Sequence, residues 1–154
     1  MPRHNEQREL PYPPSLLFDV VADIEFYPEF LPWCLATRIR ERSDNVIVAD
    51  MMIGFRGLKE SFTSHVTLNK PELKIDVTYE DGPFKYMNNK WVFTEIDKGH
   101  CRLNFFVEFE FRSQILAKLM DMLFHKAVSR MVAAFELRME KLHSVNALSP
   151  YKRR

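Results

Sequence analysis

The sequence has only two cysteines, Cys34 and Cys101, which form neither a CxxC motif nor a disulfide framework. No apolar run approaches the roughly 18–20 residues that cross a bilayer, and the initial MPRHNEQREL lacks the apolar stretch of a secretory signal. A formal net charge of +1 gives no overall basic field for nucleic acid or for an anionic membrane. These absences predict a soluble protein of a reducing compartment that binds no DNA and meets membranes only at their surface.

The motifs of common catalytic and metal sites are missing as well. The sequence has no HExxH, no glycine-rich phosphate loop and no GxSxG. Its five histidines lie far apart and lack the spacing of metal ligands. Cys34, next to Trp33, is better explained as a buried packing residue than as a nucleophile. We therefore expect no enzyme activity, no catalytic residue, no metal and no required cofactor.

Bulky apolar side chains, in contrast, are abundant, with 13 Phe and eight Met among 154 residues. Such residues favour a dense core, and the alternative is that some of them line a hollow for an apolar ligand. Residues 19–34, DVVADIEFYPEFLPWC, gather aromatic side chains around prolines, which stop helices and stiffen the chain. Together with FEFRS at 109–113, this segment is interpreted as the wall of a cavity.

The hydrophobic period gives the order of the structural elements. A first strand is expected within residues 1–12, and a helix begins at 13–15, is interrupted at Pro28 and is followed by a short second helix that ends at Pro32. Alternation with period two then predicts strands at 37–42, 46–53, 58–68, 75–80, 90–96 and 102–111. A last helix, capped by Ser113, is expected to run to about residue 143. Residues 1–143 then form a single domain and 144–154 a flexible tail.

Strands that follow one another, rather than alternating with helices, indicate an α+β fold. The last helix would be about 45 Å long, so a curved antiparallel sheet wrapped around it is expected, with a hollow between them. The apolar stripe of this helix is predicted at Leu116, Leu119, Met120, Leu123, Ala127, Met131, Ala134 and Phe135. Its polar side is predicted at Lys118, Asp121, His125, Ser129 and Glu136.

Three carboxylates have different expected surroundings. Glu60 alternates onto the same face of strand 58–68 as Phe62, and a charge on an apolar face costs several kcal/mol unless it is paired. Glu60 therefore either reaches solvent or an arginine, or lies in the cavity and hydrogen-bonds to a ligand head group. Glu108 and Glu110 alternate away from the neighbouring phenylalanines and are expected to be exposed.

Two turns, at 54–57 and 82–87, place aromatic residues beside cations. Apolar tips flanked by Lys or Arg suit contact with a membrane surface. The alternative is that both loops fold back and cap the domain.

Four segments in order carry a family resemblance: LPYPPSLLFDVVADIEFYPEFLPWC, IGFRGLKESFTSHVTL, DGPFKYMNNKWVF, and FEFRS followed by a helix with MVAAFELRM. Over residues 8–143 the chain resembles the coenzyme-Q-binding START-like family of the polyketide cyclase/dehydrase superfamily. The resemblance implies a helix-grip (START/Bet v 1-like) fold, with two short helices after the first strand and a deep apolar cavity. It also implies non-catalytic binding of a polyprenyl quinone, ubiquinone, by a lipid chaperone that supports respiratory electron transport.

Matching the motifs residue by residue implies a set of ligand-binding positions: Phe30, Pro32, Trp33, Glu60, Phe62, Phe84, Trp91, Phe109, Phe111, Met131 and Phe135. The short segment before the first motif resembles that of the bacterial members. The expected location is therefore the cytoplasm, peripheral to the inner membrane, with transient contact to the membrane surface.

Two other functions remain open. Some bacterial relatives are called ribosome-association toxins, which implies binding to the large ribosomal subunit. Arg38, Arg40 and Arg42 alternate along one strand and 152–154 add a basic end, although such a row is usually a solvated face. Aromatase/cyclase enzymes share the general fold, but the sequence offers no convergent acid–base pair, and fold alone does not assign function.

Overall fold

One antiparallel sheet and one long helix form most of the computed structural model, which describes residues 3–55 and 57–148. The strands follow the spatial order β1-β7-β6-β5-β4-β3-β2. Their bounds are β1 (Arg3–Leu10), β2 (Cys34–Arg42), β3 (Val46–Phe55), β4 (Leu58–Asn69), β5 (Lys74–Asp81), β6 (Phe84–Asp97) and β7 (His100–Phe111). The helices are α1 (Pro14–Ala22), the 3-10 helix η1 (Ile24–Glu29) and α2 (Gln114–Leu148).

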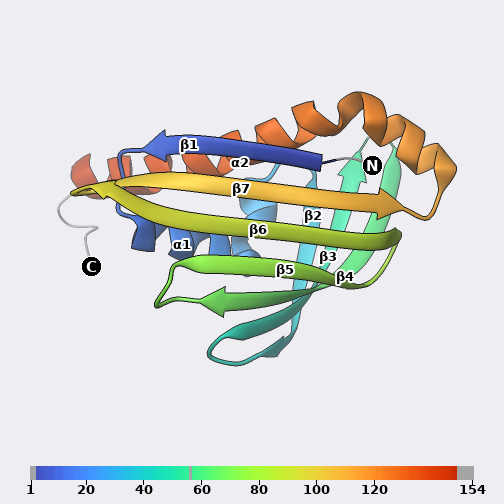
Figure 1. Ribbon diagram of the computed structural model, residues 1–154, viewed down its shortest axis with the longest axis horizontal. Coiled ribbons are helices and arrows are strands. Elements are labelled where there is room, and N and C mark those ends of the chain that lie inside the picture. Colours follow the sequence, from blue (N-terminus) through green and yellow to red (C-terminus); the bar gives the residue numbers. More distant parts are fainter. Residues whose placement is uncertain (1–2, 56, 149–154) are drawn as a thin grey trace.

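The sheet is strongly curved around α2 (Figure 1). In this view β1, β7, β6 and β5 run nearly across the picture and β2 stands steeply to them, while β4 starts steeply and then bends to run beside β5. The helix α2 runs along β1 and β7. In this view α1 lies behind the sheet and below α2. This arrangement confirms the predicted α+β helix-grip fold with two short helices after the first strand.

The two short helices differ in detail from the expectation. Pro14 occupies the first turn of α1, where a proline is tolerated. However, α1 ends at Ala22, well before the proline that was expected to interrupt it, and Pro28 lies inside η1. The Thr37 hydroxyl donates to the Ile24 carbonyl oxygen at 3.2 Å, which ties η1 to the start of the sheet.

The predicted turn at 82–87 is wrong in its extent. The chain reverses at Gly82 and Pro83, and β6 begins directly afterwards at Phe84. Phe84 and Met87 are buried, so they do not form an exposed tip for a membrane. The other turn is placed as expected, because β3 ends at Phe55 and β4 begins at Leu58, although Arg56 and the side chain of Phe55 lie outside the described residues.

The helix α2 begins and ends close to the predicted bounds. Ser113 Oγ accepts a hydrogen bond from the Leu116 N–H at 3.3 Å, which confirms the predicted N-cap. Its 35 residues make the helix about 52 Å long and extend it to Leu148, beyond the predicted end near residue 143. The expected tail therefore begins as helix, and 149–154 lie outside the described residues. Among helices of the described ranges, none combines the length and apolar character that crossing a bilayer requires.

The buried face of α2 is turned by about one residue from the predicted stripe. The most deeply buried residues of α2 are Phe124, Val128, Val132, Phe135 and Met139. Leu116, Leu119, Leu123, Ala127, Met131 and Ala134 are only half-buried, while the side chain of Met120 lies outside the described residues. The predicted stripe is displaced from the buried face because part of the polar side of α2 also contacts protein, namely the strand β1.

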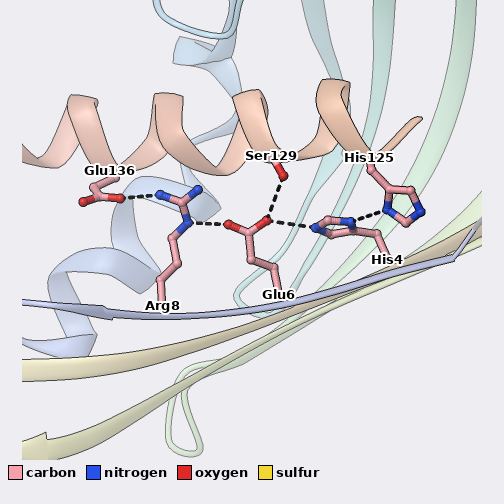
Figure 2. Close-up of polar contacts among 6 residues, drawn as sticks. All are labelled: His4, Glu6, Arg8, His125, Ser129 and Glu136. Carbon is pink, nitrogen blue, oxygen red and sulfur yellow. Dashed lines mark hydrogen bonds and ion pairs between the residues drawn. The ribbon is translucent and has the colours of Figure 1, made fainter. Parts of the chain in front are cut away.

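Three polar side chains of β1, namely His4, Glu6 and Arg8, point toward α2 (Figure 2). Arg8 Nη1 lies 2.6 Å from Glu136 Oε1, and Arg8 Nε also pairs with Glu6. We call this set the β1–α2 polar row, and it consists of His4, Glu6, Arg8, His125, Ser129 and Glu136. It fixes the long helix against the edge strand and leaves the apolar face of α2 toward the rest of the sheet.

Candidate functional site

A cavity of about 230 Å³ lies between the inner face of the sheet, the α1–η1 segment and α2. Inward-facing side chains from β3 to β7 form most of its wall, because alternation along each strand points every second residue to this side. Ala127, Val128 and Met131 of α2 close the opposite side. The cavity is therefore built by the curvature of the sheet, which keeps its centre away from the helix.

Aromatic rings hold this wall in place through edge-to-face contacts. The Trp91 ring centroid lies 4.6 Å from that of Phe105 and 5.1 Å from that of Phe135, both at steep interplanar angles. The Phe124 ring of α2 meets Phe109 of β7 at 4.9 Å between centroids. Such pairs stabilise by about 0.5–1.5 kcal/mol each beyond burial, so the helix and the sheet are joined around the cavity rather than across it.

The structure brings most of the sequence-predicted positions to this cavity. Those that line it are Trp33, Phe62, Phe84, Trp91, Phe109, Phe111, Met131 and Phe135. Their contact with a ligand stays a prediction, whereas their place on the cavity wall is a property of the fold.

Three predicted positions are not on the wall. Phe30 packs behind it, with its ring centroid 5.1 Å from that of Phe135 and the Arg138 guanidinium carbon 5.0 Å from the centroid of the Phe30 ring. Pro32 is exposed. Glu60 is half-buried opposite Ile53 of β3 and does not line the cavity, so the placement of its carboxylate as a polar group inside the hollow is not supported.

Several wall residues were not among the ligand-binding positions predicted from the sequence. Tyr27, Phe105 and Phe124 line the cavity, as do Ser64 and Asn89. Strand alternation could have found Phe105 and Ser64, since they share a face with predicted positions on β7 and β4. Phe124 was missed because the apolar stripe of α2 was placed about one residue away.

The polar atoms of the wall are almost all used within the protein. Trp91 Nε1 donates to Asn89 Oδ1 at 2.8 Å, and Asn89 Nδ2 donates to the Phe106 carbonyl oxygen at 2.8 Å. The Tyr27 hydroxyl donates to the Val21 carbonyl oxygen. Trp33 differs, because its Nε1 is buried and has no hydrogen-bond partner among the residues that the structure describes.

The cavity is also uncharged. Among the described residues that line it, none is acidic or basic, and Tyr27 is the sole titratable one. Burial, with smaller contributions from Cys34 and Asp23, raises the pKa of Tyr27 well above its ordinary value, so this phenol stays neutral. Behind the wall, burial raises the pKa of the Cys34 thiol to about 11, which fits packing rather than nucleophilic attack. The site therefore suits a neutral, mainly apolar molecule.

No group of three or more His, Cys, Asp or Glu side chains within 3–55 and 57–148 is arranged to hold a metal ion. The two histidines that do approach one another, His4 and His125, lie in the β1–α2 polar row outside the cavity.

A family model described as "Polyketide cyclase / dehydrase and lipid transport" matches residues 10–136. The ribosome association toxin RatA of Rickettsia prowazekii is 39% identical over 137 residues, which cover 86% of this chain and 92% of that protein. A mitochondrial coenzyme Q-binding protein COQ10 homolog B of Xenopus laevis is 29% identical, over 86% of this chain and 56% of that protein.

Among solved structures, a START superfamily protein from Mycobacterium smegmatis superposes with a TM-score of 0.78 at 16% sequence identity. The match covers 91% of this chain and 98% of that chain. At this identity the likeness concerns the fold alone, and the fold is START-like.

Proposed function

Because the chain belongs to the polyketide cyclase / dehydrase and lipid transport family, we propose that it is a non-enzymatic carrier that binds a polyprenyl quinone, such as ubiquinone. The observation that carries this proposal is the uncharged, aromatic cavity between the sheet and α2. A relative named as a coenzyme Q-binding protein supports the choice of ligand.

The chemistry of the wall suits such a lipid. Each square ångström of apolar surface that moves from water into the cavity stabilises the complex by about 25 cal/mol. Met51, Met87 and Met131 contribute flexible side chains to the wall, and methionine adapts its shape to irregular ligands. A carrier needs no more than this, because the quinone remains chemically unchanged.

The size of the cavity limits how much of the ligand is enclosed. Its volume of about 230 Å³ is below the roughly 300–1,000 Å³ of sites that enclose drug-sized molecules. A long polyprenyl tail therefore either projects from the protein or enters after α2 moves away from the sheet. Either route fits transient contact with a membrane surface, where the tail can pass between protein and bilayer, and we place the protein in the cytoplasm beside the inner membrane.

Filling the cavity provides the direct test. Ala127 is half-buried and lines the cavity, whereas Ala133 lies on the same helix and is exposed. We expect Ala127→Trp to place an indole in the space that the ligand needs, and Ala133→Trp to leave that space free. Both variants are produced in a ubiquinone-making bacterium, and the lipid extracted from each purified protein is identified by mass spectrometry.

Wild type and Ala133→Trp should retain quinone, and Ala127→Trp should retain little while still unfolding cooperatively on heating. If wild type repeatedly carries no lipid and takes up no decylubiquinone on titration, the proposed function is wrong. Equal retention by Ala127→Trp and wild type would show that the lipid binds elsewhere.

A second candidate function is association with ribosomes, which the name of a relative at 39% identity favours. The three arginines predicted to contact the ribosome give little support to this function, because each already pairs with a carboxylate. Arg38 and Arg40 both pair with Asp50, at 3.1 and 2.7 Å, and Arg42 pairs with Glu25 at 2.6 Å. Residues 152–154 lie outside the described ones. Cosedimentation with large ribosomal subunits over a salt series tests this function, because binding through phosphates weakens steeply with salt.

An enzymatic role is the least supported. The family description includes cyclases and dehydrases, but the described cavity wall presents no acid–base pair, and a fold does not assign a reaction. Turnover of a polyketide-like substrate that is lost on changing Glu60 would favour it.

A further inference from the structure

The chain has two tryptophans, and both line the cavity, but they differ in whether the indole N–H has a hydrogen-bond partner among the described residues. Trp91 Nε1 donates to Asn89 Oδ1 at 2.8 Å. Trp33 Nε1 is buried, and no described residue accepts its hydrogen bond. A buried donor without an acceptor is unfavourable, and such a group in a native structure calls for an explanation, of which an acceptor supplied by a ligand is one.

The backbone of Trp33 is fixed at the junction of η1 and the sheet. Its carbonyl oxygen accepts a hydrogen bond from the Gly54 N–H at 2.9 Å, and the next residue, Cys34, donates its N–H to the Leu31 carbonyl oxygen at 3.3 Å. Leu31 and Gly54 both line the cavity. The backbone on both sides of Trp33 is therefore anchored, which keeps the residue beside the cavity, while its side-chain torsions decide which way Nε1 points.

The remaining polar groups of the wall do not require a hydrogen-bond acceptor from a ligand. Tyr27 and Asn89 are already engaged in hydrogen bonds within the protein. Ser64 is buried on the wall, but a hydroxyl can rotate to donate or accept, so it requires neither. An indole N–H can only donate. Trp33 is thus the wall residue that selects for one kind of ligand atom.

We propose that Trp33 Nε1–H donates a hydrogen bond to a carbonyl oxygen of the ligand head group, and that it makes this cavity prefer carbonyl-bearing lipids over hydrocarbons of similar shape. The inference rests on the proposed function, since it names the residue that recognises the quinone ring. A neutral carbonyl suits the site, because the wall offers no charge to balance an ionised head group.

Two substitutions and two ligands separate this role from simple packing. Trp33→Phe removes the free N–H and keeps an aromatic ring, and Trp91→Phe removes an N–H that already has a partner. Decylubiquinone carries ring carbonyls, whereas decylbenzene has the same tail and no acceptor. Binding of each ligand to each protein is measured by isothermal titration calorimetry.

We expect Trp33→Phe to weaken decylubiquinone binding about tenfold, as the loss of one hydrogen bond implies, and to leave decylbenzene binding nearly unchanged. Trp91→Phe should change the affinity for both ligands by similar factors. Equal effects of Trp33→Phe on both ligands would overturn the inference while leaving the carrier function intact. Failure of wild type to bind either ligand would instead refute the proposed function.

A spectroscopic measurement on the wild-type protein checks the same contact without relying on a variant. Its two indole N–H groups give two resonances in a ¹⁵N–¹H NMR spectrum, which the two Phe variants assign. A new hydrogen bond deshields the proton, so decylubiquinone should move the Trp33 proton resonance downfield and decylbenzene should not. If decylubiquinone binds and the Trp33 resonance stays in place, the proposed hydrogen bond does not form.

Discussion

His4 Nδ1 on β1 and His125 Nδ1 on α2 lie 2.9 Å apart, so a ring-to-ring hydrogen bond joins the edge strand to the long helix. The second nitrogen of His4, Nε2, lies 2.8 Å from Glu6 Oε1, which can only accept. A neutral His4 therefore carries its proton on Nε2 and accepts through Nδ1 from His125.

Replacing His125 with alanine removes the donor to His4 and leaves a largely buried ring nitrogen with one fewer partner. We expect the free energy of unfolding to fall by about 1 kcal/mol, the usual worth of one hydrogen bond. Urea unfolding at neutral pH measures the change. Lys126→Ala, a change at an exposed neighbour on the same helix, serves as the control. Alanine favours a helix at either position, so an equal loss there would show that the histidine contact is not responsible.

Ionisation of Glu6 should make the free energy of unfolding depend on pH in the acidic range. Burial alone would raise its pKa, but hydrogen bonds from His4 and Arg8, together with the Arg8 charge, outweigh burial and hold the pKa of Glu6 below its ordinary value. The stabilisation is therefore complete above the unfolded-state pKa, near 4.3, and disappears as pH falls through the lower folded-state pKa.

We expect the free energy of unfolding, measured in urea, to fall more steeply for wild type than for Glu6→Gln between about pH 5 and 3. Glu9→Gln changes an exposed glutamate of the same strand, whose ion pair with Arg102 lies at the surface and contributes little. It should follow wild type. Parallel curves for wild type and Glu6→Gln would exclude Glu6 as a source of acid sensitivity.

Gly82 is required by both its backbone and its surroundings. Its φ is +144°, and a Cβ at this position would lie 2.5 Å from Phe62 Cβ and 2.9 Å from Phe62 Cα. Gly99 also has a positive φ, +78°, but has open space around the same atom. We expect Gly99→Ala to cost about 1–2 kcal/mol of stability from backbone strain, and Gly82→Ala to cost clearly more in chemical denaturation. Similar losses would mean that the chain yields easily beside Phe62.

Both cysteines should be unreactive in the native protein. Burial raises the pKa of Cys34 and of Cys101 to about 11, so both remain protonated thiols at neutral pH. We expect a thiol-directed chromogenic disulfide to react with neither in the folded state and with both once guanidinium chloride unfolds the chain. Rapid reaction of one thiol in the native protein, identified with Cys34→Ala, would show that its surroundings open readily.

The strands were predictable where period two is uninterrupted. On β4, alternation correctly put Phe62 and Val66 on the inner side. It failed at the start of β6, where a register shift between Phe84 and Tyr86 breaks the period. The buried Phe84 and Met87 are therefore three positions apart, a spacing that does not indicate a strand. A local pattern cannot reveal a bulge that is set by the partner strand.

The polar side of α2 was misjudged for a related reason. His125, Ser129 and Glu136 have the composition of a solvated face, yet they meet β1, whose inner side is itself polar. Which face of a helix meets water depends on elements more than one hundred residues away. The candidate site shows the same limit, since the family resemblance selected Trp33 for the cavity but only the tertiary structure reveals its unpaired N–H.

The pairing of β1 with β7 has a consequence for how the protein folds. Arg3 lies opposite Glu108 across the two strands, a separation of 105 positions, and contacts this distant in sequence slow folding. The hairpins from β2 to β6 join neighbouring segments and can form early. The N-terminal strand acquires its partners only when β7 and α2 exist. We therefore expect the cavity to close in the last step, when the first and final elements of the chain meet.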